Sequence, residues 1–264
     1  MDDLIEKVRL NGIEKKENWL SLSDQEKIKN IISLINASKG DSKSWFVVKF
    51  KLFLIKFLKF QFKSIIRSLF FIGLSKKLKL KNIAEKILEN KAELIGIDCY
   101  CNPRSEKPVL DWHLDNAYSG RADVKNFVDP DKNAIKFFFY LTDVSMDNGC
   151  LSYIPKSNKI AHALKKGIYE KAINYSPYWT LSDFRKTILI KKNFEYVKNI
   201  VGEDLILEFL KMTSFVENKN LNTNAFDFEV NKGGAVIFDE AGIHRGSKTK
   251  FNERLALRFL YRKI

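Results

Sequence analysis

The stretch GGAVIFDEAGIHRGSKTKFNERLALRF (233–259) holds two apolar runs on either side of a short polar segment. Runs of this length and composition predict a strand, a loop and a second strand. Because side chains alternate along a strand, Arg254 and Arg258 share one face of the second run, and Leu255 and Leu257 share the other. We therefore predict a sheet with an apolar face packed under helices and two arginines on its opposite face.

Short runs rich in β-branched and aromatic residues recur through the second part of the chain, at 93–102, 135–144, 150–155, 233–240 and 254–261. Asn, Gly, Pro and Asp separate them, a pattern typical of a sandwich or barrel. The segment 1–92 is predicted to be largely helical, and the long interval 160–225 to be a helical insertion or lid. We expect one domain over 1–264, with its β core in 93–264.

The bulk composition is that of a globular protein, with 45% hydrophobic and 30% charged residues. The charged start of the chain does not resemble a signal peptide, and three cysteines are too few for a disulfide scaffold, so we expect a cytoplasmic protein. Cys99 and Cys101 are expected in the core. The net charge of +14 is interpreted as lysines that solvate the surface, and without a nucleic-acid motif no nucleic-acid partner is expected.

The segment 44–77 is apolar but repeatedly interrupted by lysine and arginine. On a helical wheel its basic residues form one narrow stripe, which comprises Lys49, Lys56, Lys59, Lys63 and Arg67. We favour a long helix that packs against the sheet and keeps this stripe in water. The alternative is a helix that makes peripheral contact with a membrane surface.

The stretch DWHLDNAY (111–118) places His113 and Asp115 two positions apart in a chain with only three histidines. On a strand both side chains point the same way, so they offer two ligands of a 2-His-1-carboxylate iron site. The spacing alone is weak evidence. His244, just past the first strand of 233–259, is the candidate third ligand, and an inward Arg254 needs an anionic partner.

Three blocks together resemble the phytanoyl-CoA dioxygenase type of Fe(II)/2-oxoglutarate oxygenases. They are WHLD (112–115), FFFYLTDVSMDNGCLSYIPKSNK (137–159) and the GG…F…IHRG…R pattern within 233–259. The resemblance implies a mainly β protein with flanking helices. Its fold would be a double-stranded β-helix, a cupin-like jelly roll, with the N-terminal helices packed on one sheet.

The resemblance also implies roles for individual residues. His113, Asp115 and His244 would hold Fe(II), and Arg254 would bind the far carboxylate of the cosubstrate 2-oxoglutarate. Arg258 is the runner-up for that carboxylate, because it lies on the same strand face. Dioxygen is the second cosubstrate.

Other cosubstrate contacts are weaker candidates: Ser247 for a hydrogen bond to the far carboxylate, and Tyr100 and Asn102 for the wall of the pocket. The chain departs from the family pattern at Lys156 and Asn158, where a glycine and a histidine are usual. This departure concerns the shape of one loop near the pocket and leaves the three metal ligands intact.

The implied function is a dioxygenase that hydroxylates a small-molecule or lipid-like substrate and converts 2-oxoglutarate to succinate and CO2. Because Asp115 is present, hydroxylation is favoured over the halogenation carried out by family members that lack this carboxylate. The basic charge suggests an anionic or carrier-linked substrate. The alternative function is a non-catalytic membrane- or lipid-binding module on the same fold, suggested by the segment 44–77.

Four further residues carry minor expectations. Trp112 is expected to be a packing residue whose other face could touch substrate, and His162 to lie on the surface of a helix. Asp239 and Glu240 lie shortly before His244 and could accept a hydrogen bond from its second ring nitrogen. We favour solvent exposure for both carboxylates.

Overall fold

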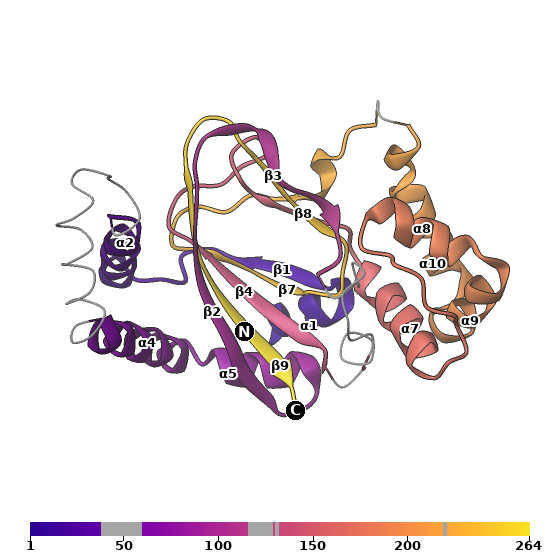
Figure 1. Cartoon of the computed structure of the whole chain (residues 1–264), viewed down its shortest axis with the longest axis horizontal. Coiled ribbons are helices and arrows are strands. Elements are labelled where there is room, and N and C mark those ends of the chain that lie inside the picture. Colours follow the sequence, from indigo (N-terminus) through magenta and orange to yellow (C-terminus); the bar gives the residue numbers. More distant parts are fainter. Residues whose placement is uncertain (38–59, 116–128, 130–131, 219–220) are drawn as a thin grey trace, which may run out of the picture.

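The structure is a computed structural model and describes residues 1–37, 60–115, 129, 132–218 and 221–264. Two antiparallel sheets form its centre (Figure 1). The larger sheet has the strand order β1 (Ile13–Lys16), β7 (Ala235–Asp239), β4 (Ala134–Tyr140), β9 (Arg254–Lys263) and β2 (Ala92–Asn102). The smaller sheet has the order β3 (Ser105–His113), β8 (His244–Thr249), β5 (Leu151–Tyr153) and β6 (Asp227–Phe228). This is the predicted double-stranded β-helix with flanking helices.

Helices from the first part of the chain cover the outer face of the larger sheet (Figure 1). They are α1 (Asp2–Asn11), α2 (Leu22–Ala37), α4 (Phe60–Lys77) and α5 (Leu80–Leu88). Leu257 and Phe259 of β9 are fully buried beneath them, together with Leu80 of α5. The prediction that this face of 254–261 packs under helices is therefore confirmed, because the alternation places every second side chain of β9 in that apolar layer.

The opposite face of the larger sheet looks toward the smaller sheet. Phe138 and Tyr140 of β4 and Phe238 of β7 lie between the sheets in one apolar cluster. Arg254 and Arg258 emerge from β9 on this same inner side, because Phe138 pairs with Arg258 in the β4–β9 register. On this inner side β4 and β7 contribute aromatic side chains and β9 contributes two arginines.

The interval 160–225, predicted as a helical insertion or lid, is largely helical and its first helix begins at Ser157, whereas the role of a lid stays a prediction. It contains α7 (Ser157–Tyr169), α8 (Leu181–Leu189), α9 (Lys191–Val201), α10 (Glu203–Met212) and the 3-10 turns η3 (Ser214–Val216) and η4 (Asn224–Phe226). These helices form their own apolar cluster beside the two sheets (Figure 1). The backbone N–H of Leu114 donates to the carbonyl of Trp179 at 3.0 Å, so the insertion is joined to the end of β3.

Four strands lie outside the predicted runs, and of β3 only the end at His113 was treated as a strand. β1 lies within the segment predicted to be helical, β8 begins where a loop was predicted, and β6 is only two residues long. The sequence of β1 is mostly charged, and it becomes a strand by pairing with the edge of β7. The backbone hydrogen bonds come from a distant partner, so no local pattern signals them.

The cysteines of β2 and the segment 44–77 differ in how far the structure tests them. Cys101 is exposed and Cys99 only partly buried, so the prediction that both lie in the core is wrong for Cys101. Within 44–77 the structure shows helix α4, but residues 44–59 and the side chains of the basic stripe lie outside what it describes. Among the described helices, none is both long and apolar enough to span a bilayer.

Candidate metal centre and its cavity

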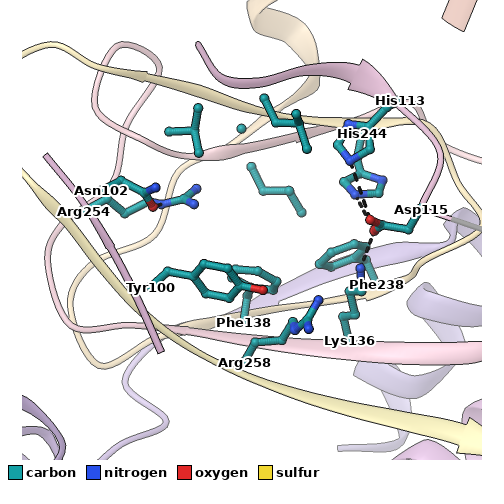
Figure 2. Close-up of a pocket in the computed structure, with 14 residues that line it drawn as sticks. Tyr100, Asn102, His113, Asp115, Lys136, Phe138, Phe238, His244, Arg254 and Arg258 are labelled. Atoms are coloured by element: carbon teal, nitrogen blue, oxygen red, sulfur yellow. Dashed lines mark hydrogen bonds and ion pairs between the residues drawn. The ribbon is translucent and has the colours of Figure 1, made fainter. Parts of the chain in front are cut away.

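Two adjacent strands of the smaller sheet bring the candidate ligands together. His113 is the last residue of β3, His244 is the first of β8, and the two are cross-strand partners with ring centroids 4.4 Å apart. Asp115 lies two residues beyond His113, past the end of the strand. One ligand atom from each residue falls within 4.8 Å of the others (Figure 2). The structure therefore assembles from distant segments the three residues that the sequence singled out.

Backbone carbonyls fix the orientation of both imidazole rings. Nδ1 of His113 lies 2.6 Å from the carbonyl oxygen of Asp111, and Nδ1 of His244 lies 2.8 Å from that of Gly242. A carbonyl only accepts, so each Nδ1 donates and each Nε2 keeps its lone pair. A side chain at Gly242 would collide with the hydroxyl of Tyr153, so a glycine is required there.

The two free Nε2 atoms face a carboxylate. Nε2 of His244 is 2.9 Å from Oδ2 of Asp115, and Nε2 of His113 is 3.7 Å from Oδ1. Lone pairs on three neighbouring groups repel one another unless a cation is shared among them. The donor set of two imidazole nitrogens and one carboxylate suits a divalent transition metal such as Fe(II). The residues present therefore fit a metal ion at this position.

The electrostatic surroundings keep these ligands in their metal-binding forms. Burial by itself would raise the pKa of Asp115, but His244 and Lys136 outweigh it and hold that pKa well below the ordinary value. Burial lowers the pKa of His244, against the opposing pull of the Asp115 carboxylate. Near neutral pH the site thus offers an ionised carboxylate and a neutral imidazole, as metal binding requires.

The sequence reading overlooked Lys136. Its ammonium group contacts Oδ2 of Asp115 and lies 3.5 Å from Oε2 of Glu240, and the side chain is 5% exposed. The available signal was a lysine inside IKFFFY, an otherwise apolar strand on which every second residue turns inward. A lysine at such a position needs carboxylate partners, and the fold supplies two of them.

The metal site opens into a cavity of about 220 Å³ between the sheets. Its wall comprises Tyr100, Asn102, Val109, Leu110, His113, Asp115, Lys136, Phe138, Leu151, Phe238, His244, Gly246, Arg254 and Arg258. Figure 2 shows the histidines and Asp115 at one end and Arg254 with Asn102 at the other. The cavity is therefore elongated, with metal ligands and a guanidinium at opposite ends.

The two arginines of β9 differ in their partners. Nε of Arg254 donates to Oδ1 of Asn102 at 3.0 Å and Nη1 donates to the carbonyl of Gly149 at 3.2 Å. No carboxylate pairs with Arg254 within the described part of the chain, although it is only 5% exposed. Arg258 donates from Nε and Nη2 to Oδ2 of Asp98. The buried cation at the far end of the cavity is therefore the one that lacks an anion.

Of the weaker sequence candidates, two line the cavity and one does not. Tyr100 and Asn102 line the cavity, Tyr100 through a ring stacked on Phe138 at 5.6 Å between centroids. Ser247 is not among the lining residues, and its hydroxyl lies 3.5 Å from Sγ of Cys150. Its place beside the cosubstrate remains a prediction without support from the geometry.

The expectations for residues around His244 are partly wrong. Asp239 and Glu240 are 8% and 5% exposed, so both are buried and the predicted solvent exposure is wrong. Neither is the partner of His244, whose Nδ1 uses the backbone of Gly242. His162 lies on helix α7 as expected, but it is half-buried and its Nε2 lies 2.7 Å from Oδ2 of Asp239.

Trp112 packs as predicted. Its ring lies 5.5 Å from that of Phe215 and 6.1 Å from that of Phe226, and the guanidinium of Arg245 lies 4.9 Å from its centre. These contacts join β3 to the end of the helical insertion. They fix the strand that ends in His113, so Trp112 supports the metal centre through packing.

Comparison with known proteins gives a consistent result. The profile of the phytanoyl-CoA dioxygenase (PhyH) family matches residues 61–252, and no curated protein matches the chain. Among solved structures, the epimerase SnoN, in complex with Fe3+, α-ketoglutarate and nogalamycin RO, aligns with a TM-score of 0.55 and 11% identity over 99% of this chain and 83% of its own. HygX from Streptomyces hygroscopicus, with nickel and 2-oxoglutarate bound, aligns with a TM-score of 0.54 and 13% identity over 99% and 86%. The carbocyclase SnoK from nogalamycin biosynthesis aligns with a TM-score of 0.55 and 11% identity over 100% and 84%.

Proposed function

The chain belongs to the phytanoyl-CoA dioxygenase family and is an oxygenase, and we propose that it is an Fe(II)- and 2-oxoglutarate-dependent hydroxylase of a small molecule. The observation that carries this proposal is the pairing of two features in one cavity. His113, Asp115 and His244 converge at one end, and Arg254 lies buried without a carboxylate partner at the other.

This pairing matches the chemistry of 2-oxoglutarate. The cosubstrate is a dianion with a 2-oxo acid at one end and a second carboxylate at the other. A planar guanidinium binds a carboxylate with two parallel hydrogen bonds, so Arg254 suits the second carboxylate. Asn102 accepts from Nε of Arg254 and fixes the direction of the guanidinium. Arg258 is less suited to this role, because Asp98 already occupies two of its nitrogens.

The protein's part in the reaction is to bind, orient and exclude water. Three protein ligands leave open coordination positions, and when bound there Fe(II) supplies the activation of dioxygen. Phe138, Phe238 and Leu151 provide an apolar wall that keeps water from the reacting end of the cavity. Lys136 holds the Asp115 carboxylate from the side opposite the histidines and limits its rotation.

Similar structures support the cofactor and the substrate class. SnoN holds Fe3+ and α-ketoglutarate with a natural product, and HygX holds nickel and 2-oxoglutarate. A small-molecule substrate is consistent with these neighbours and with a cavity of about 220 Å³. Hydroxylation rather than halogenation is supported by Asp115, because its carboxylate occupies the position that a halide would need. The expected products from the cosubstrate are succinate and CO2.

The alternative of a non-catalytic lipid-binding module has less support. A chain that had lost its chemistry would have no need to keep three ligands with both imidazole tautomers fixed by the backbone. The segment that suggested membrane contact lies in part outside the described residues, so that contact stays a prediction. Binding to anionic vesicles with no succinate formed under any condition would favour the alternative.

The proposal can be tested spectroscopically. Anaerobic addition of Fe(II) and 2-oxoglutarate should produce a visible charge-transfer absorption, and exposure to dioxygen should yield succinate. His113→Ala should abolish both, whereas Lys186→Met, a change at an exposed position on α8, should leave both intact. Folded, iron-loaded protein without the absorption band would refute the proposal.

A further inference from the structure

A second group of cations lies in the same cavity, apart from Arg254. Lys136 of β4 and Arg258 of β9 are on neighbouring antiparallel strands, where Phe138 pairs with Arg258 and Lys136 with Leu260. Lys136 and Arg258 are therefore diagonal neighbours on the inner face, a separation that long side chains can bridge. Figure 2 shows their charged ends on the side of the cavity near Asp115, away from Arg254.

Arg258 is held in a fixed orientation but is not saturated. Nε and Nη2 both donate to a single oxygen of Asp98, and the guanidinium lies 5.6 Å from the centre of the Tyr100 ring. A guanidinium has five N–H groups, and no hydrogen bond from Nη1 of Arg258 is found within the described part of the chain. Donors thus remain available to a ligand in the cavity.

Metal binding would change the balance of charge on this wall. Asp115 is one of two carboxylates beside Lys136, and Glu240 is the other. When Asp115 ligates a divalent ion, its negative charge is shared with that ion. Lys136 and Arg258 then lie beside a dication with only Glu240 and Asp98 to compensate them, and an added anion would be stabilised there.

The proposed cosubstrate does not by itself supply this anion. One carboxylate of 2-oxoglutarate is matched to Arg254 at the far end of the cavity, and the other belongs to the end that chelates the metal. We propose that Lys136 and Arg258 form a separate site for an anionic group, a carboxylate or a phosphate or sulfate ester, on the prime substrate. This proposal rests on the proposed function, because it assigns the substrate class of the same cavity.

The same cations could instead contact the metal-chelating carboxylate of 2-oxoglutarate, so the experiment must separate the two sources. Protein loaded with Co(II) and N-oxalylglycine, a non-reacting analogue of 2-oxoglutarate, is titrated with sulfate by calorimetry. Sulfate should bind this complex. In Arg258→Gln or Lys136→Met the affinity for sulfate should fall by about tenfold or more, which is the effect of losing a charged hydrogen bond. Arg258→Gln should bind N-oxalylglycine within about threefold of the wild type, whereas Arg254→Met should weaken N-oxalylglycine binding by about tenfold or more.

The opposite patterns would overturn the proposal. Unchanged sulfate affinity in Arg258→Gln would show that no anion site exists, and a tenfold loss of N-oxalylglycine affinity would assign Arg258 to the cosubstrate. Failure of Co(II) and N-oxalylglycine to bind the wild type would refute the proposed function instead. When both bind and sulfate does not, the anion site alone is refuted and the proposed function stands.

A double variant distinguishes loss of the anion site from loss of the fold. Lys136→Met leaves Glu240 buried without its lysine and is the variant more prone to destabilisation. Arg258→Gln combined with Asp98→Asn removes both members of a pair whose carboxylate is 44% exposed, so the fold should tolerate it. The double variant should also lose sulfate binding, and its thermal unfolding should match that of the wild type within a few degrees.

Discussion

The protein brings histidine and aspartate side chains together in two clusters, the metal centre and the pair of His162 and Asp239, and the two differ in which ring nitrogen is left free. In the metal centre, both histidines donate from Nδ1 to a backbone carbonyl and turn Nε2 toward Asp115. In the second cluster, Nε2 of His162 is itself the atom that contacts Asp239, at 2.7 Å. The first cluster therefore presents lone pairs to a cation, whereas the second forms a closed hydrogen-bonded pair.

The difference has a simple backbone origin. Each metal-centre histidine uses the carbonyl two residues before it, and neither of these carbonyls belongs to a helix. His162 lies on helix α7, where backbone carbonyls are consumed by the helix. Asp239 is further occupied by Nδ2 of Asn158 at 3.1 Å and by the N–H of Ala241 at 3.0 Å. In this protein the backbone occupies Nδ1 of both metal-centre histidines and leaves Nε2 free, whereas Nε2 of His162 is taken by Asp239.

The largest expected effect comes from His244→Ala. Loss of one of three ligands should reduce metal affinity by more than about a hundredfold, beyond what is typical for loss of an outer partner, and should abolish succinate formation. Calorimetric titration with Co(II) measures the affinity. The matched control is His162→Gln, which should bind Co(II) within about threefold of the wild type. Equal losses in the two variants would contradict the distinction between the clusters.

A smaller effect on the same centre is expected from Asp115→Asn. The amide keeps the shape of the side chain but removes the negative charge that attracts both the ammonium group of Lys136 and the metal ion. The affinity for Co(II) should therefore fall by about ten- to a hundredfold. The histidines should still bind some metal, visible as a weakened Co(II) absorption spectrum. Full metal affinity in this variant would show that the carboxylate is not a ligand.

Asp239→Asn should affect stability and leave the metal in place. Burial raises the pKa of Asp239, but His162 and its other donors outweigh burial and hold the pKa below the ordinary value. A lowered folded-state pKa contributes stability that is present above the unfolded pKa near 3.8 and is lost as the pH falls through the folded pKa. The variant should be less stable by about 1–3 kcal/mol at neutral pH.

The pH dependence provides the check on that prediction. In urea unfolding, the difference between wild type and Asp239→Asn should shrink as the pH falls below about 4. A difference that stays constant from neutral to acid pH would show that the charge of Asp239 has no role. Metal affinity should stay within about threefold of the wild type, because Asp239 does not contact either metal-centre imidazole.

The smallest effect is expected from His162→Gln. A glutamine amide can still donate to Asp239, so the free energy of unfolding should fall by about 1 kcal/mol or less. Thermal unfolding at neutral pH measures this change. A loss as large as that of Asp239→Asn would mean that the imidazole charge, rather than its hydrogen bond, stabilises the pair.

Much of the fold was visible in local patterns. The runs that became β2, β4, β5, β7 and β9 were recognisable because alternation and β-branched or aromatic content are local properties. β1, β3 and β8 are mostly polar and were not among the predicted runs, because their stability comes from the strands beside them. Pairing energy from distant residues leaves no trace in the composition of the segment itself.

The sequence by itself pointed to the residues of the candidate metal centre through three blocks that together resemble one family. Alternation placed Arg254 and Arg258 on one strand face, whereas Asp115 lies past the end of β3, where alternation no longer applies. Only the tertiary structure decided the free nitrogen of each imidazole, the contact of Lys136 with Asp115, the burial of Asp239 and the different partners of the two arginines. The physical reason is that alternation fixes the direction of a side chain along its own strand. Its hydrogen-bond partner and its dielectric surroundings depend on which distant segments pack against it.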